Sequence, residues 1–227
     1  MAEIVYLDSP MESEPLYEQL CPPVRRWFRD KFPDFTAPQK LAIPSIMNKE
    51  HLLLCSPTGS GKTLTAFLSI IDNLVRLSLD QKLEKKVHAI YISPIKALAN
   101  DIQRNLIGPL KEITENYLPD RAQEIRVGLR TGDTSQSDRQ KMLRKPPHIL
   151  ITTPESLAIA ITSPRFQPIV SEVEYMIIDE LHSMVSTKRG VHLSLTLSLL
   201  DTLLKNPVQR IGISATMEPL ETVAEYL

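Results

Sequence analysis

The chain has 227 residues, of which 42% are hydrophobic and 23% charged, and its formal net charge at pH 7 is −1. These proportions match a folded globular domain and exclude a disordered or fibrous chain. The small net charge argues against a protein held on nucleic acid by bulk electrostatics alone, but it allows phosphate binding through backbone amides and helix N-termini.

Helical segments punctuated by proline fill the first 48 residues, and short apolar runs then alternate with longer amphipathic stretches. Single polar stripes predict helices at residues 64–79 and 191–205. Six apolar runs predict buried strands at residues 51–55, 87–93, 125–130, 148–152, 173–179 and 209–214. This alternation is typical of a three-layer α/β/α sandwich with a mainly parallel central sheet. Ligands of such sheets bind beyond the carboxyl ends of the strands, so function should be sought in the residues that follow each strand.

The first predicted strand is followed by Ser56-Pro57-Thr58-Gly59-Ser60-Gly61-Lys62-Thr63. This sequence matches the phosphate-loop pattern G-x-x-x-x-G-K-S/T, except that Ser56 takes the place of the first glycine. Gly59 and Gly61 would let backbone N–H groups converge on phosphate oxygens, at the positive end of the helix that follows. Lys62 would neutralise the β- and γ-phosphates, and the Thr63 hydroxyl would ligate Mg²⁺. We therefore expect residues 57–63 to bind a nucleoside triphosphate.

The fifth predicted strand ends in Asp179-Glu180-Leu181-His182. Asp179 would hold Mg²⁺, directly or through water, and Glu180 would polarise the attacking water, with Lys62 as the third catalytic residue. Two carboxylates at a strand end are common and usually solvated. Their pairing with a phosphate loop 117 residues upstream (179 − 62) indicates hydrolysis of the nucleotide rather than binding alone.

The remaining strand ends complete a series of motifs: Phe35-Thr36-x-x-Gln39, Ser93-Pro94-Ile95-Lys96-Ala97-Leu98-Ala99, Arg130-Thr131-Gly132-Asp133-Thr134, Thr152-Thr153-Pro154-Glu155-Ser156-Leu157 and Ser214-Ala215-Thr216. With the phosphate loop and the D-E-x-H box, this ordered series resembles the superfamily 2 DExH-box helicases. The chain is most similar to the large helicase-related (Lhr-type) family in a combination of segments: TGDTSQSDRQ at residues 131–140, then PESL at 154–157, then DELH followed by Ser186-Thr187-Lys188-Arg189-Gly190. A Ski-type or DNA-repair helicase of the same superfamily is the nearest competitor.

The resemblance implies a RecA-like P-loop NTPase fold in residues 35–227, preceded by a helical lead with the adenine-side element in residues 1–34. It implies the first motor domain of an ATP-dependent DNA or RNA helicase or translocase, with ATP and Mg²⁺ as cofactors and single-stranded DNA or RNA as partner. A second RecA-like domain and C-terminal accessory domains would lie outside these residues. The isolated chain should then bind nucleotide without unwinding. A non-motor phosphate-loop NTPase or a small-molecule kinase is the alternative, and stimulation of ATPase activity by nucleic acid would discriminate between them.

The resemblance also implies roles for individual residues. The amide of Gln39 can match N6 and N7 of adenine, although an ordinary helix-surface glutamine is the alternative. His182, Ser214 and Thr216 would couple the nucleotide to nucleic acid. Thr153 followed by Pro154 predicts a helix N-terminus, which could hold a phosphate or simply cap a helix. The expected nucleic-acid-binding residues are Pro94, Lys96, Arg130, Thr131, Gly132, Thr153, Pro154, Glu155 and Arg189.

Only 7 residues are glycine. Gly128 and Gly212 lie inside predicted strands, where we expect close approach of a neighbouring element, and Gly108 before Pro109 predicts a helix stop. Trp27, Phe28, Phe32 and Phe35 could stack on a base or form core, and the sequence does not choose. The chain has no apolar run long enough to span a membrane and two cysteines without metal-ligand spacing, so we expect no membrane partner and a cytoplasmic location.

Overall fold

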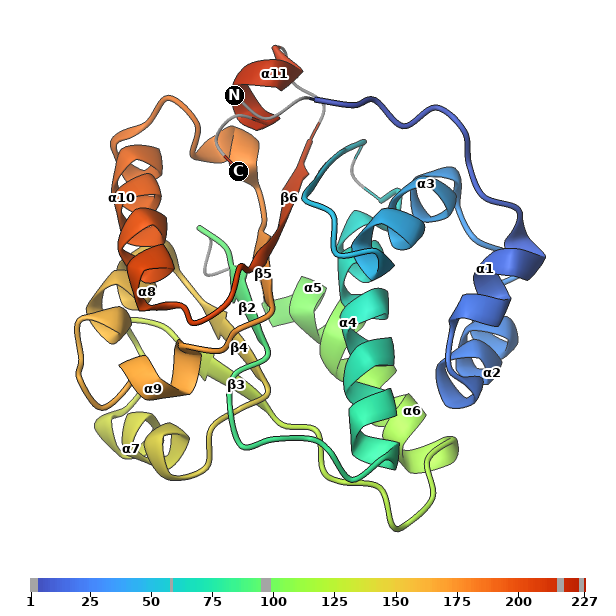
Figure 1. The fold of residues 1–227 in the computed structure, drawn as a ribbon, viewed down its shortest axis with the longest axis horizontal. Coiled ribbons are helices and arrows are strands. Elements are labelled where there is room, and N and C mark those ends of the chain that lie inside the picture. The colour runs from blue at the N-terminus through green and yellow to red at the C-terminus, as the bar shows by residue number, and fades with distance from the viewer. Residues whose placement is uncertain (1–3, 58, 95–98, 216–218, 225–226) are drawn as a thin grey trace.

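The computed structural model describes residues 4–57, 59–94, 99–215, 219–224 and 227, and its centre is one parallel sheet (Figure 1). The six described strands are ordered β1-β6-β5-β2-β4-β3, and every neighbouring pair is parallel. Their bounds are Leu52–Cys55 (β1), Ala89–Ile92 (β2), Val127–Arg130 (β3), Ile149–Thr152 (β4), Tyr175–Ile178 (β5) and Gln209–Ser214 (β6). The parallel sheet predicted from the sequence is confirmed.

The central strands are apolar on both faces because helices cover the sheet on both sides. In β2, Ala89 and Tyr91 pack into one core cluster, whereas Ile90 and Ile92 pack into the other. All four residues of β2, β4 and β5 are buried. This burial explains why these strands appear in the sequence as continuous apolar runs rather than as alternating patterns.

Helices form the two outer layers, as Figure 1 shows. One face carries α1 (Ser13–Gln19), α2 (Pro22–Lys31), α3 (Ala37–Met47), α4 (Lys62–Leu79), α5 (Ala99–Ile102), the π-helix η2 (Gln103–Ile107) and α6 (Gly108–Asn116). The other face carries α7 (Gln136–Arg144), α8 (Pro154–Ile161), α9 (Gln167–Val170), the 3₁₀ helix η3 (Leu181–Ser183), α10 (Lys188–Leu203) and α11 (Leu220–Ala224). The three-layer α/β/α architecture is therefore confirmed.

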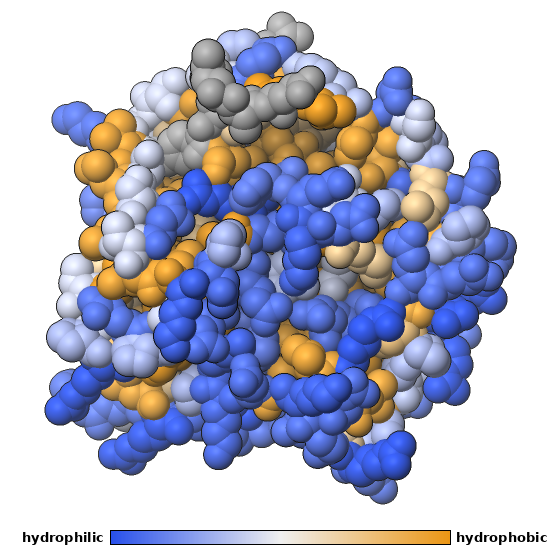
Figure 2. All heavy atoms as spheres, in the orientation of Figure 1, coloured by the Kyte–Doolittle hydropathy of each residue, from blue (hydrophilic) through white to orange (hydrophobic). Residues whose placement is uncertain are grey.

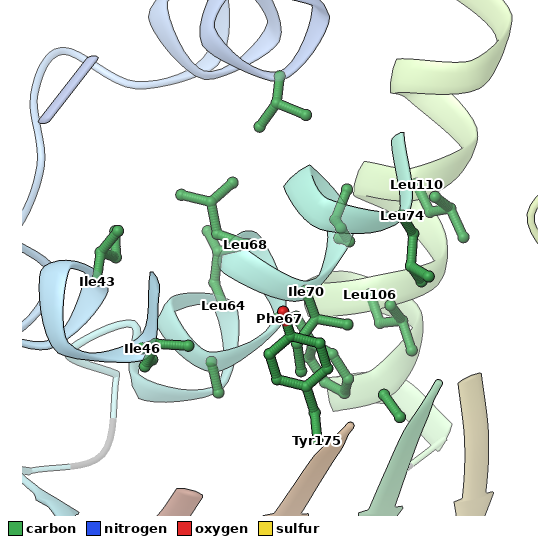
Figure 3. Packing of buried hydrophobic residues seen from close by; sticks show 14 of the residues in the cluster. Ile43, Ile46, Leu64, Phe67, Leu68, Ile70, Leu74, Leu106, Leu110 and Tyr175 are labelled. Atoms are coloured by element: carbon green, nitrogen blue, oxygen red, sulfur yellow. The ribbon is translucent and has the colours of Figure 1, made fainter. Parts of the chain in front are cut away.

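Helix α4 is the centre of the first layer. Phe67 and Ile70 point from α4 towards the strands in Figure 3, where Tyr175 of β5 meets them. The rings of Phe67 and Tyr91 are 5.0 Å apart. Because α4 begins immediately after the phosphate loop, this packing fixes the loop relative to the sheet.

The N-terminal helices belong to the same core. Phe28 and Phe35 are buried and stack with ring centroids 4.3 Å apart, and Trp27 is buried beside them. Asp72 of α4 accepts hydrogen bonds from the Cys21 backbone N–H at 2.6 Å and from Arg76 Nε at 2.7 Å. The aromatic residues left open by the sequence are thus core residues, and a buried carboxylate ties their helices to α4.

The glycine predictions have mixed outcomes. A Cβ at Gly128 would lie 2.8 Å from the Pro147 ring, and one at Gly212 would lie 2.5 Å from Leu181, so close approach is confirmed at both positions. The predicted helix stop at Gly108 is wrong, because Gly108 is helical and begins α6 directly after η2. A Cβ at Gly108 would lie 3.0 Å from the Gln103 carbonyl oxygen, so the glycine lets the π-turn pass into the α-helix.

The face of the molecule drawn in Figure 2 is mostly hydrophilic, with hydrophobic residues visible over α10. Val191, Leu195 and Leu199 of α10 are among the exposed large hydrophobic residues. In the described segments, no helix combines the length and the apolar character that crossing a bilayer requires.

Candidate functional site

The phosphate loop has the backbone that the motif predicts. Gly59 and Gly61 adopt φ values of +82° and +86°, in the left-handed region that favours glycine. Helix α4 starts at Lys62 without a side-chain cap and without an acidic residue in its first turn. Its first N–H groups are therefore not used by a side-chain cap, at the positive end of the helix dipole, as an anion site requires.

Ser56 shows why the missing first glycine is tolerated. Only Gly59 and Gly61 have positive φ among the described loop residues, so position 56 does not need glycine. The Ser56 hydroxyl contacts the Ser60 hydroxyl across the loop, and its N–H donates to the Ser214 carbonyl at 3.4 Å. The serine braces the loop against β6.

Lys62 lies over the loop, within electrostatic reach of the DExH box. Its Nζ donates to the carbonyl oxygens of Ser56 and of Pro57, the latter at 2.7 Å. Partial burial lowers the pKa of Lys62, while Glu180 and Asp179 raise it. Loop lysine and both carboxylates, far apart in the sequence, therefore share one electrostatic environment.

Asp179 is held from two sides at the end of β5. It is buried; its Oδ2 accepts a hydrogen bond from the Tyr91 hydroxyl, and its Oδ1 accepts one from the Glu180 N–H at 2.8 Å. Burial raises the pKa of Asp179, although the Tyr91 hydrogen bond lowers it. The sequence did not identify Tyr91, whose position inside an apolar run gives no signal of this contact.

Glu180 and His182 join the DExH box to the end of β6. Glu180 has φ +54°, a left-handed conformation that is costly for a residue with a Cβ and is often found at functional sites. His182 Nδ1 accepts a hydrogen bond from the Ala215 N–H at 3.1 Å and lies 3.4 Å from Ser214 Oγ. The acceptor role places the ring proton on Nε2, which lies 3.1 Å from Glu180 Oε2.

Gln39 packs beside the phosphate loop. Its Oε1 accepts from the Thr36 N–H at 2.8 Å in a capping box at the start of α3. Its Nε2 would lie 3.4 Å from a Cβ at Gly61. The sequence assigned Gln39 to adenine and missed the cap, although the spacing Thr36-x-x-Gln39 is a capping-box signature.

The structure gathers the predicted nucleic-acid segments at one edge, because β3, β4 and β2 are neighbours. The Ser93 N–H donates to the Thr152 carbonyl at 3.1 Å, and the Thr152 hydroxyl donates to the Arg130 carbonyl at 2.8 Å. Thr153 caps α8 as predicted, with Oγ1 accepting from the Ser156 N–H at 3.3 Å. The residues placed together here are Pro94, Arg130, Thr131, Gly132, Thr153, Pro154 and Glu155.

Two arginines at this edge have partners within the chain. The Arg130 guanidinium lies 4.6 Å from the Phe166 ring centroid, and burial together with Arg139 lowers the pKa of Arg130. Arg189 donates from Nε to Glu155 Oε1 at 2.7 Å and from Nη2 to the Pro94 carbonyl at 2.9 Å. Three of the predicted site residues, Thr58, Lys96 and Thr216, lie outside the described residues.

Comparison with known proteins decides the family. The sequence model of the family described as "DEAD/DEAH box helicase" matches residues 36–224, most of the chain. The chain belongs to the DEAD/DEAH box helicase family. The superfamily resemblance predicted from the motif order is confirmed. The predicted similarity to Lhr-type helicases agrees with the relatives that follow.

Lhr proteins are among the curated relatives of this helicase-family chain. The ATP-dependent helicase Lhr-Core of Methanocaldococcus jannaschii is 50% identical over 229 residues, which cover 100% of this chain and 27% of the relative. The Lhr helicase/uracil glycosylase of Escherichia coli is 45% identical, covering 97% of this chain and 15% of the relative. The chain thus spans about a quarter or less of the length of these relatives.

Solved structures agree in fold. A structure of Mycobacterium smegmatis helicase Lhr bound to ssDNA and AMP-PNP superposes with a TM-score of 0.82 at 42% identity, covering 92% of this chain and 26% of that one. The DEAD-box helicase Mss116, bound to ssRNA and UDP-BeF, shares the fold with a TM-score of 0.76 at 22% identity. The RecA-like fold predicted from the motifs is confirmed.

Proposed function

We propose that this chain is the ATP-binding first motor domain of an ATP-dependent helicase or translocase that acts on single-stranded DNA or RNA. One observation carries the proposal: His182 contacts Glu180 through Nε2 and the segment after β6 through Nδ1. The loop lysine Lys62 lies within electrostatic reach of Glu180 and Asp179. This arrangement connects a nucleotide site to the other strand ends. A kinase or a simple nucleotide-binding protein has no need of that connection.

The loop residues fit ATP with Mg²⁺. Pro57, Thr58, Gly59, Ser60 and Gly61 would surround the phosphates, Lys62 would neutralise them, and Gln39 would meet the adenine. Thr63 and Asp179 would supply protein oxygens to Mg²⁺. In the described parts of the chain, no three His, Cys, Asp or Glu side chains cluster as a metal site. Mg²⁺ bound with nucleotide needs only one or two protein ligands, so this donor set is sufficient.

Hydrolysis would depend on Glu180. Its carboxylate would accept a hydrogen bond from the attacking water and orient it, as water-positioning residues do in related hydrolases. His182 Nε2–H would hold this carboxylate in place. The hydrogen bond to His182 Nδ1 would make the position of the ring depend on the segment Ser214-Ala215-Thr216. The positive charge that stabilises the transferring phosphate would come in part from a second RecA-like domain.

The edge formed by β2, β3 and β4 would bind the single strand. Pro94, Lys96, Arg130, Thr131, Gly132, Thr153 and Pro154 would contact it, and the description of the M. smegmatis Lhr structure as bound to ssDNA supports this assignment. C-terminal accessory domains would complete the motor. The two cysteines are free thiols, which fits a cytoplasmic protein.

ATPase assays of Lys62→Ala test the proposal in the full-length protein. We expect ATP turnover to fall by about 10²-fold or more, because the charge that binds and stabilises the phosphates is lost. Lys82→Ala is the matched control, since Lys82 is a largely exposed lysine beyond the end of α4. Oligothymidylate and oligouridylate should each be tested for stimulation of the wild-type rate.

Stimulation by either oligonucleotide in the wild type, together with its loss in Lys62→Ala but not in Lys82→Ala, is the expected result. Equal ATP turnover with and without nucleic acid would contradict a motor function and favour a non-motor NTPase.

A further inference from the structure

Arg189 joins two segments of the edge that the sequence assigned to nucleic acid. It lies in the first turn of α10, and its guanidinium reaches the Pro94 carbonyl after β2 and the Glu155 carboxylate in the first turn of α8. The hydrogen bond from Arg189 is the main cause of the lowered pKa of Glu155. One side chain therefore bridges three elements: the end of β2, the start of α8 and the start of α10.

The same arginine is connected to the DExH box by a short, hydrogen-bonded segment. The Ser183 N–H donates to the Glu180 carbonyl at 2.8 Å, and the Thr187 hydroxyl donates to the Met184 carbonyl at 2.7 Å. Thr187 then caps α10 by accepting from the Gly190 N–H at 3.2 Å. Arg189 lies nine residues after Glu180 (189 − 180). These local hydrogen bonds restrict the conformations of the segment between the two residues.

We propose that Arg189 and Glu155 form a positioning pair that sets the N-terminus of α8 against the end of β2, and that neither is itself a ligand of the nucleic acid. This inference rests on the proposed function, because the pair would position the strand-binding edge. The geometry favours it over direct contact, since Nε and Nη2 of Arg189 already donate to acceptors within the chain. A carboxylate such as Glu155, moreover, would repel a phosphate rather than bind it.

The pair is not there for stability alone. The side chains of Arg189 and Glu155 are 45% and 51% exposed, and exposed ion pairs contribute little to folding. Variants of either residue should therefore fold, and their effect should fall on the edge that they align.

Because Glu155 is negatively charged, its substitution distinguishes a positioning role from an electrostatic one. Glu155→Gln removes a negative charge next to a polyanion, so electrostatics alone would tighten the binding of single-stranded DNA. Loss of positioning would instead weaken it, by about threefold to tenfold for a pair coupling of ordinary size. The matched control is Glu115→Gln, which removes one exposed carboxylate from an i,i+4 pair with Lys111 on the opposite layer.

The measurement is fluorescence anisotropy of labelled oligothymidylate with the full-length protein and AMP-PNP·Mg²⁺, at several salt concentrations. We expect the single variants Glu155→Gln and Arg189→Lys to bind the oligonucleotide more weakly than the wild type. The double variant Glu155→Gln/Arg189→Gln should bind it no more weakly than Arg189→Gln alone. The slope of log Kd against log salt should stay unchanged in Arg189→Gln. An arginine that contacts phosphate would instead reduce this slope by about 1. In ATPase assays, the oligonucleotide concentration for half-maximal stimulation should rise, with the maximal rate retained.

Tighter or equal binding by Glu155→Gln, or a reduced salt slope in Arg189→Gln, overturns the inference. Failure of the wild type to bind oligothymidylate would instead overturn the proposed function, so the two failures are distinguishable. If a single variant does not fold, the affinity of the charge-exchanged double variant Glu155→Arg/Arg189→Glu for oligothymidylate tests the inference instead. Restored affinity supports positioning, and affinity as low as that of Arg189→Gln contradicts it.

Discussion

Gly212 of β6 packs against the turn that carries Glu180. A Cβ at this position would meet Leu181 at 2.5 Å and Leu53 at 3.0 Å, and Leu181 is fully buried next to Glu180. We predict that Gly212→Ala lowers the free energy of unfolding by about 1–3 kcal/mol, the usual cost of overpacking. Urea denaturation of the 227-residue chain measures it.

Gly132→Ala is the matched control for this substitution. A Cβ at Gly132 has no atom within 4 Å, and its φ is not in the left-handed region. Its urea midpoint should equal that of the wild type. Equal midpoints for both alanine variants would show that Leu181 can move at no cost.

At the residue scale, the sequence predicts the residues of a motif but not the tertiary contacts that these residues make. Lys62, Asp179 and Glu180 are predictable because their chemistry depends on type and order along the chain. The hydroxyl of Tyr91 on Asp179 and the guanidinium of Arg189 on Glu155 are not, because each joins segments far apart in the sequence. The assignment of Glu155 and Arg189 to nucleic acid came from the family resemblance of residues 152–157 and 186–190, which carries no information about their partners.

At the scale of elements, Asp72 fastens the N-terminal helices to α4. It is 3% exposed and accepts hydrogen bonds from the Cys21 N–H and from Arg76, whose Nη2 also donates to the Gln19 carbonyl. We predict that Asp72→Asn lowers the free energy of unfolding by about 1–3 kcal/mol, because one amide cannot satisfy both donors. Amide hydrogen exchange in α1 and α2 should be faster in Asp72→Asn than in the wild type, and the increase should be larger there than in the sheet.

Glu115→Gln serves as the control for Asp72→Asn, since its carboxylate is paired on the surface of α6 and exposed. Unchanged exchange in α1 and α2 of Asp72→Asn would show that aromatic packing alone holds these helices.

The elements themselves were largely predictable. Each of the six strands lies within two residues of its predicted bounds, because buried parallel strands leave continuous apolar runs. The direct passage from η2 into α6 at Gly108 was not, since glycine followed by proline usually ends a helix. Here proline takes the first turn of α6, and the π-turn before it accommodates the missing N–H.

At the scale of the whole molecule, buried ionisable groups lie at both ends of the sheet. Asp179 follows β5, whereas His88 and His148 directly precede β2 and β4, and the partly buried Glu174 precedes β5. Burial and the Arg126 guanidinium lower the pKa of His148 to about 3. An unfolded histidine titrates near about 6.5. Unfolding therefore takes up a proton between these two values.

We predict that acid lowers the free energy of unfolding through His148, at the end of the sheet where the strands begin. A histidine with a depressed folded pKa stabilises fully above about pH 6.5, and this stability declines as pH falls towards 3, by at most about 1.4 kcal/mol per pH unit. His148→Asn keeps an acceptor for the Arg126 N–H but cannot titrate. Its urea midpoint should fall less than that of the wild type between about pH 7.5 and about pH 5.

His192→Asn, an exposed position on α10, is the control and should follow the wild type. A parallel decline of His148→Asn and wild type would place the acid sensitivity elsewhere.

The strand order has a consequence for how the chain acquires its nucleotide site during synthesis. Among the described strands, β1 pairs only with β6, so Leu52 finds its partner in Ile211, 159 residues later (211 − 52). Contacts over such separations form slowly, because a long loop must close first. A nascent chain that has left the ribosome as far as α10 holds every residue of the phosphate loop, yet lacks the strand that anchors it. The ability to bind ATP should therefore be the last property that this chain gains as it folds.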